Sequence, residues 1–250
     1  MKLFKIFILF ATFVAFTHTS NAQNPFENPK NLEVLPEDIP AERLRQIMRG
    51  FSFALGEQCS YCHDRVETDD GASMVWDTDN KDMKRVAREM MKLSGSINRD
   101  IAALNRGDDH QYTRVVCTTC HRGQANPFLI EQVMSEQIAE GGVEAARAKY
   151  ADLKSKYYGG HTYDFTGFTL AEYANSLINA NSLDNALDMA KFSVEQYPTE
   201  TYAHTILGNV YMAQKNYAEA ISAYEGSLAL NPDQDGVINQ IENAKKAMEE

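Results

Sequence analysis

Two copies of a five-residue motif, Cys-x-x-Cys-His, constrain this chain more than any other feature of its sequence. They span residues 59–63 and 117–121 and together use all four cysteines. Two thiols at this spacing, followed at once by an imidazole, form the attachment pattern of c-type haem. The thiols bond to one porphyrin, and the adjacent histidine ligates its iron. We therefore predict two covalently bound haem c groups, held by these residues: Cys59, Cys62 and His63; Cys117, Cys120 and His121.

Other uses of paired cysteines fit the sequence less well. Paired thiols can build a tetrahedral zinc site, but the two pairs lie much further apart than the roughly 15–20 residues of a zinc ribbon. In an exported protein, four cysteines usually form two disulfides. Neither alternative gives a reason for a histidine directly after both pairs, whereas haem attachment requires it.

The N-terminal residues have the pattern of a secretory signal. Lys2 and Lys5 precede an apolar run over residues 6–16, and small residues at 20–22 offer a cleavage site. A membrane anchor is the alternative, but the run is well below the roughly 20 residues that span a bilayer. We expect residues 1–22 to be removed and the mature protein to be periplasmic or extracellular, either soluble or peripherally attached to a membrane.

The chain is acidic, with a formal net charge of −11 at pH 7. Loss of residues 1–22 would make it more acidic, because this segment holds two lysines and no acid. A negative field repels nucleic acid and speeds the approach of basic partners, less so at high salt. We therefore expect no nucleic acid partner and a preference for basic redox proteins, although solubility alone would account for the charge equally well.

Apolar spacing predicts a mainly α-helical chain. A helix with apolar residues from Leu44 to Leu55 is expected to stop at Gly56, before the first motif, and a longer amphipathic helix is expected over about residues 81–104. The polar stretch 64–80 is predicted to be a loop. Residues 23–125 should thus form a multihaem cytochrome c domain with little regular structure beyond helices.

The last third of the chain contains an internal repeat of 34 residues, which aligns Ala186 with Ala220 and Pro198 with Pro232. This is the period of the tetratricopeptide repeat. We predict a helical linker at 126–166, repeats at 167–200 and 201–234, and a capping helix at 235–250. Since fewer than three repeats are marginally stable alone, this α-helical solenoid should pack on the preceding helices. Its expected role is protein docking.

Each haem iron of an electron carrier needs a sixth ligand, usually methionine or histidine. Met48 lies on the apolar face of the helix before the first motif. Met90 lies on the apolar line of the next helix, and Met91 is rotated about 100° away from it. We favour Met48 for the first haem and Met90, rather than Met91, for the second. Core filling is the alternative role of each methionine.

With these motifs in place, residues 44–123 resemble the cytochrome subunit of photosynthetic reaction centres, and more closely its dihaem relatives outside phototrophs. The resemblance implies that a methionine on the helix before each haem ligates the iron, which points to Met48 and Met90. The reaction-centre subunit has four haems and often a lipid anchor, whereas this sequence has two motifs and no anchoring cysteine, so photosynthesis is not implied. The matching segments are Met48, Leu55-Gly56, Lys84-x-x-Ala87-Arg88-x-Met90, Ile97-Asn98 and Cys117-x-Thr119-Cys120-His121-Arg122-Gly123.

The leading hypothesis is an electron carrier, and not an enzyme, that exchanges electrons with protein partners such as a respiratory or photosynthetic membrane complex. One alternative is a dihaem peroxidase in which one iron keeps an open position. Another is a repeat-based scaffold whose haems act as a redox sensor. Two methionine-ligated irons favour the carrier, because methionine ligation raises the haem potential and fills the sixth position.

Overall fold

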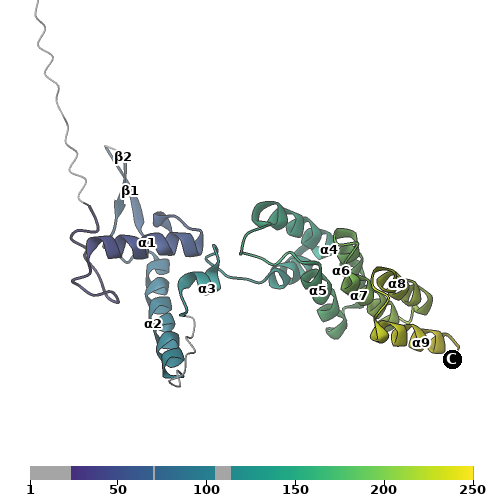
Figure 1. Ribbon diagram of the computed structural model, residues 1–250. Helices are drawn as coiled ribbons and strands as arrows, with labels where there is room; N and C mark the ends of the chain where they lie inside the picture. Colours follow the sequence, from purple (N-terminus) through teal and green to yellow (C-terminus); the bar gives the residue numbers. More distant parts are fainter. Residues whose placement is uncertain (1–23, 70, 105–113, 250) are drawn as a thin grey trace, which may run out of the picture. The chain divides into compact units, whose positions relative to one another are not determined.

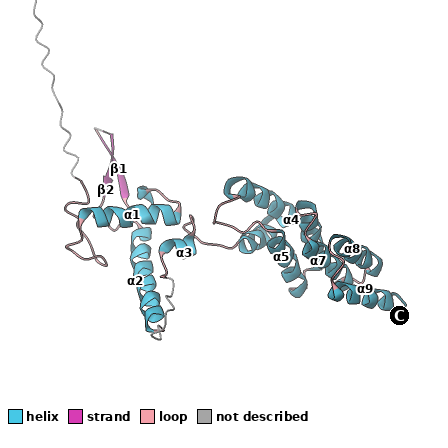
Figure 2. Cartoon of the chain, in the orientation of Figure 1, coloured by secondary structure: helices cyan, strands magenta, loops and turns pink. Residues whose placement is uncertain are grey.

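The computed structural model describes residues 24–69, 71–104 and 114–249, so the predicted signal segment 1–22 lies outside it. The chain divides into two compact units. The first comprises Met1–Gly50 and Gln58–Tyr112, and the second comprises Phe51–Glu57 and Thr113–Glu250. Both are mainly helical, as predicted (Figures 1 and 2). Each unit contains one Cys-x-x-Cys-His motif.

Helix α1, Ala41–Leu55, follows Pro40 and ends at Gly56 as the sequence predicts. Gly56 has a φ of +69°. Glycine enters this left-handed region without the steric penalty that a side chain brings, and it commonly terminates helices for that reason. The end of α1 therefore fixes where the chain turns into the first motif, whose three-residue helix η1 is Cys59–Tyr61.

The prediction of a loop over residues 64–80 is wrong in part. Strands β1, Asp64–Thr68, and β2, Gly71–Val75, form an antiparallel hairpin that projects from the first unit (Figure 1). Thr68 and Gly71 are the last pair at the end of the hairpin. Most of the hairpin is exposed. It has no buried face and thus none of the alternation of apolar and polar residues by which a strand is recognised in sequence.

Helix α2, Asp82–Ala103, agrees with its prediction to within a residue at each end. In the second unit, α3, Cys117–His121, is the second haem motif itself. Helix α4, Ile130–Tyr157, is broken at Gly142, whose φ of 75° and ψ of −174° are not helical. Gly142 therefore divides α4 into two helical segments.

Five further helices follow in succession through the C-terminal part of the second unit (Figure 1). Neighbours along the chain pack on one another, as helix pairs of tetratricopeptide repeats do. The five helices are α5 (Gly167–Asn179), α6 (Leu183–Gln196), α7 (Thr201–Ala213), α8 (Tyr217–Leu230) and α9 (Asp235–Glu249).

The repeats share their core with α4, which confirms the prediction that they pack on the preceding helices. Met134 and Tyr150 of α4 are 1% exposed and lie in one apolar cluster with Met189 of α6 and Ile206 of α7. The hydroxyl groups of Tyr150 and Tyr197 are hydrogen-bonded at 2.6 Å. Helix α4 is therefore a structural part of the repeat module.

The two repeats use different residue pairs at the same contact between their two helices. In the second repeat, a Cβ atom on Gly208 would lie 2.4 Å from the ring of Tyr224. The positions 34 residues earlier are Ala174 and Ala190, both fully buried. A smaller partner at 190 leaves space for the methyl group at 174, so the first repeat departs from the sequence pattern without losing the helix contact.

Candidate functional site

The first motif forms a tight turn that is held by Lys81, the residue directly before α2. The His63 amide donates to the Cys59 carbonyl at 3.0 Å. The Lys81 ammonium donates to the Ser60 carbonyl, between the two cysteines, at 2.5 Å. The turn thus presents two thiols and an imidazole from a short segment whose backbone is fixed by hydrogen bonds.

His63, the predicted proximal ligand, is partly enclosed by protein. The Trp76 indole meets its imidazole edge-on, with ring centroids 5.1 Å apart. The Nδ1 atom is buried and has no hydrogen-bond partner among the described residues. Burial, and then the nearby Lys84 ammonium, lower the pKa of His63. Its neutral form, which is the form that ligates a metal, is therefore favoured.

A network of charges fixes the segment that carries Trp76. The Lys84 ammonium donates to the carbonyls of Trp76 and Thr78 at 3.0 and 2.7 Å. The Arg88 guanidinium, 9% exposed, pairs with Asp79 at 3.1 Å and with Glu33 at 2.9 Å. Arg88, and then Lys84, lower the pKa of Asp79 to about 2. The Lys84 and Arg88 motif seen in the sequence therefore holds Trp76 against His63.

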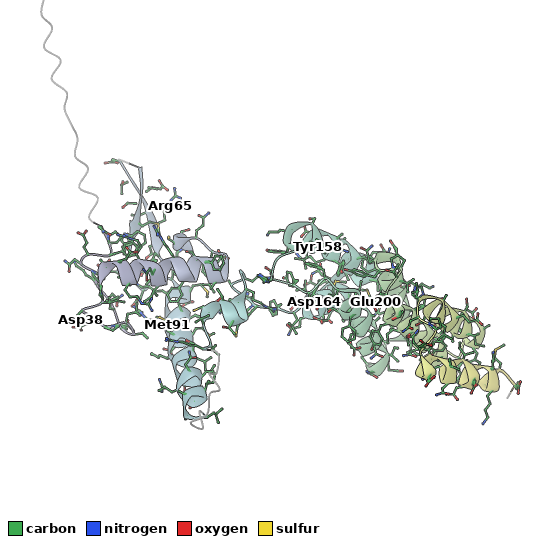
Figure 3. The ribbon with its side chains drawn as sticks, viewed as in Figure 1. Asp38, Arg65, Met91, Tyr158, Asp164 and Glu200 are labelled. Atoms are coloured by element: carbon green, nitrogen blue, oxygen red, sulfur yellow. The ribbon has the colours of Figure 1, made fainter. Side chains whose placement is uncertain are left out.

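Helix α2 has two unlike faces. Lys84, Arg88 and the half-buried Met91 lie at steps of four and three residues and so share the packed face. Met91 is labelled on α2 in Figure 3. The other face is apolar and open to solvent in the described part of the chain: Val86 is 45%, Met90 42%, Leu93 52% and Ile97 37% exposed. Exposed apolar patches of this kind commonly mark a surface that binds a ligand or a partner.

The second motif fixes its histidine more completely. Nδ1 of His121 lies 3.0 Å from the Gln124 carbonyl oxygen. A carbonyl only accepts, so in the neutral imidazole Nδ1 carries the proton and Nε2 keeps its lone pair. Metal-bound histidines commonly donate their second ring nitrogen in this way. The imidazole of His121 is thus already in the tautomer that a haem iron requires.

A close backbone approach supports the chain directly after this motif. The Gly123 amide donates to the Ala54 carbonyl at 2.8 Å. A Cβ atom on Gly56 would lie 2.3 Å from the Gly123 carbonyl oxygen. Leu55-Gly56 and Arg122-Gly123, two of the matching segments in the sequence, therefore meet in space, and glycine at 56 is what allows them to.

The residues present fit haem attachment. No disulfide joins any of the four cysteines. Among the described residues, no three His, Cys, Asp or Glu side chains converge as the ligands of a zinc site would. His121 has the required tautomer, and His63 is shielded. The shielding of His63 by Trp76 and the orientation of the His121 imidazole suit ligands of a haem iron whose porphyrin is bonded to the neighbouring thiols.

The proposed sixth ligands remain predictions. Met48 lies half-buried on α1 in the same unit as His63. Met90 and His121 belong to different units, so their pairing is not decided by the structure. Sequence reasoning did not assign roles to Trp76 or Gln124. The single tryptophan of the chain was a visible signal, but nothing local marked the glutamine.

Comparison with known protein families agrees with this site. The sequence matches the photosynthetic reaction centre cytochrome C subunit family over residues 17–167. The chain belongs to this family. The match extends beyond the second motif through α4, and a tetratricopeptide repeat is matched at residues 201–234. A comparison with curated proteins finds no match.

Membership of the reaction-centre cytochrome family confirms the main sequence interpretation. The chain is a c-type cytochrome that binds haem covalently, transfers electrons and carries a protein-interaction repeat module. Members of the family are electron carriers and not enzymes. No helix in the described ranges combines the length and the apolar character needed to cross a bilayer.

Proposed function

We propose that the protein is an exported dihaem cytochrome that passes electrons between redox proteins through one haem in each compact unit. The observation that carries this proposal is the presence of a complete Cys-x-x-Cys-His motif in each unit. A bound haem supplies reversible one-electron chemistry at its iron. The chain supplies attachment, ligation and shielding.

The protein side chains act by holding imidazoles still. His121 offers Nε2 because the Gln124 carbonyl holds the Nδ1 proton. His63 is kept neutral by burial and is packed against Trp76, which Lys84 secures. Fixed ligands need little rearrangement when the iron changes charge. This favours a carrier over a site that must open for substrate.

The open face of α2 supports Met90 over Met91 as an iron ligand. Met90 lies in an exposed apolar stripe of the kind that a flat porphyrin would cover. Met91 lies half-buried on the face that carries Lys84 and Arg88. Met48 is proposed for the first haem, since it shares a unit with His63.

The charge and the repeats support the proposed partners. The net charge of −11 favours basic redox proteins, and the repeats favour protein docking, including docking to a respiratory or photosynthetic membrane complex. We place the mature protein in the periplasm or outside the cell. The N-terminal signal pattern supports this location.

Haem counting tests the proposal directly. The full chain is produced with haem maturation, and its haem content is measured by alkaline pyridine spectroscopy and intact mass. We expect two haems in the native chain and one in each of the variants C59S/C62S and C117S/C120S. A native chain with one haem, or a pair of cysteines whose loss changes nothing, would contradict the proposal.

Matched methionine variants test the ligands. In the oxidised protein, M48L and M90L should each remove part of the near-infrared methionine-to-iron charge-transfer band, while M91L should leave it intact. Loss of the band in M91L with retention in M90L would reverse the assignment. A high-spin native haem together with peroxide turnover would instead favour the peroxidase alternative.

A further inference from the structure

The segment between α4 and α5 reaches back to the second haem motif. Tyr158 and Asp164, labelled in Figure 3, belong to this segment. The Thr162 hydroxyl donates to the Arg122 carbonyl at 3.0 Å, and the Tyr163 hydroxyl donates to the Gln124 side-chain oxygen at 2.9 Å. Both acceptors lie within three residues of His121. The backbone carbonyl of the same Gln124 accepts the His121 Nδ1 proton.

Tyr163 is also part of the aromatic packing of the repeat module. Its ring lies 5.5 Å from that of Tyr157 and 6.0 Å from that of Phe165, measured between centroids. Phe165 is 7% exposed and packs edge-on against Tyr150 at 5.6 Å. The Tyr197 hydroxyl donates to the Phe165 carbonyl. One continuous set of contacts therefore joins the core shared by α4 and α6 to residue 124.

Hydrogen bonds beyond the ligand itself influence a bound metal. The partner of a ligating imidazole fixes the ring orientation and the basicity of the nitrogen that binds the metal. A stronger Nδ1–H···O bond gives the imidazole more negative character and favours the oxidised iron. The Gln124 carbonyl can act in this way only while residues 122–124 hold their position, and Thr162 and Tyr163 bond to both ends of that segment.

We propose that Tyr163 and Thr162 are positioning residues for the second haem, through which the repeat core sets the potential of that haem. This inference rests on the proposed attachment of haem at Cys117 and Cys120. Burial raises the pKa of Tyr163, so its hydroxyl remains a donor at neutral pH. The linker to the repeats is therefore a functional part of the electron-transfer site.

Single-atom variants of the loaded, full-length protein test the proposal. Y163F removes one hydroxyl oxygen, and T162V replaces the other hydroxyl with a methyl group. Y157F is the matched control, because it removes a hydroxyl from the ring that packs on Tyr163 without touching residues 122–124 in any contact the structure shows. Haem content and thermal unfolding are measured first, and then each haem is titrated by spectroelectrochemistry.

We expect Y163F and T162V each to raise the midpoint potential of the second haem while that of the first stays constant. Loss of the direct partner of a metal-ligating histidine typically costs about 10–100-fold. Thr162 and Tyr163 act on the segment that holds this partner and not on the imidazole itself, so we expect at most about a tenfold change, which corresponds to about 59 mV for a one-electron couple. The Nδ1 proton of His121 should also exchange faster with deuterated water, whereas Y157F should match the native chain. Y163F and T162V proteins that hold two haems but show native potentials and exchange would overturn the inference. An equal shift in Y157F would also overturn it, and a native chain lacking the second haem would instead defeat the proposed function.

Discussion

Replacement of Gly56 by alanine should lower the free energy of unfolding more than the same replacement at a glycine whose φ is also positive but whose Cβ position is open. Two costs combine at this position. The φ of +69° is a left-handed conformation that costs an alanine about 1–2 kcal/mol. The new Cβ would also lie 2.3 Å from the Gly123 carbonyl oxygen, and a backbone atom cannot swing away as a side chain can.

The clash has its own magnitude. Forcing a methyl group into a closely packed site costs about 1–3 kcal/mol, so the free energy of unfolding should fall by about 2–5 kcal/mol in G56A. Gly159 gives the matched control: its φ is +80°, and nothing lies within 4 Å of a built Cβ. G159A should therefore lose only the backbone part, about 1–2 kcal/mol.

A second control, Gly50, lies in α1, the helix that ends directly before Gly56. Gly50 has ordinary helical geometry and open space around its Cβ position, so G50A should raise the free energy of unfolding by about 0.5–1 kcal/mol. Denaturant unfolding of the loaded protein, followed by circular dichroism and by haem absorbance, measures all three variants. If G56A proved no less stable than G159A, the close approach of residues 56 and 123 would not exist in solution.

Two further predictions concern the charge network and the repeats. Arg88 and then Lys84 depress the pKa of Asp79 from 3.8 to about 2, so its stabilising effect is complete above pH 3.8 and is lost as the pH falls towards 2. D79N should therefore flatten the acid side of the stability profile over that window, whereas an unchanged profile would show that the pair is not formed. In the second repeat, G208A should cost about 1–3 kcal/mol because its methyl group meets the Tyr224 ring. The same change in a Y224A background, which reproduces the Ala174 and Ala190 pair of the first repeat, should cost clearly less, and additive losses in a double-mutant cycle would refute the explanation.

The sequence predicted helices well where periodicity was strong. Helix α2 and the end of α1 at Gly56 came within a residue of their expected positions, because apolar spacing and a glycine stop are local signals. The hairpin formed by β1 and β2 was missed because it lacks such a local signal. Its strands bury no face, so the backbone pairing that forms them leaves no pattern in the side chains.

The site divides in the same way. The four cysteines, His63 and His121 were predicted because haem attachment requires these residue types within five consecutive positions. Trp76 beside His63, and Gln124 beside His121, were not assigned roles. Each is held in place by a residue of another segment: Lys84 donates a hydrogen bond to the Trp76 carbonyl, and Tyr163 donates one to the Gln124 side chain.

The sequence alone determined where haem attaches and that a 34-residue helical repeat follows, since both are written in side-chain identity at fixed local spacing. Tertiary structure decided which face of α2 stays open, why Gly56 must be glycine, and that Tyr163 reaches Gln124. These features join segments tens of residues apart through backbone carbonyls and single hydroxyl groups. Any residue supplies the carbonyl, and many supply the hydroxyl, so folding alone selects the pairs that meet.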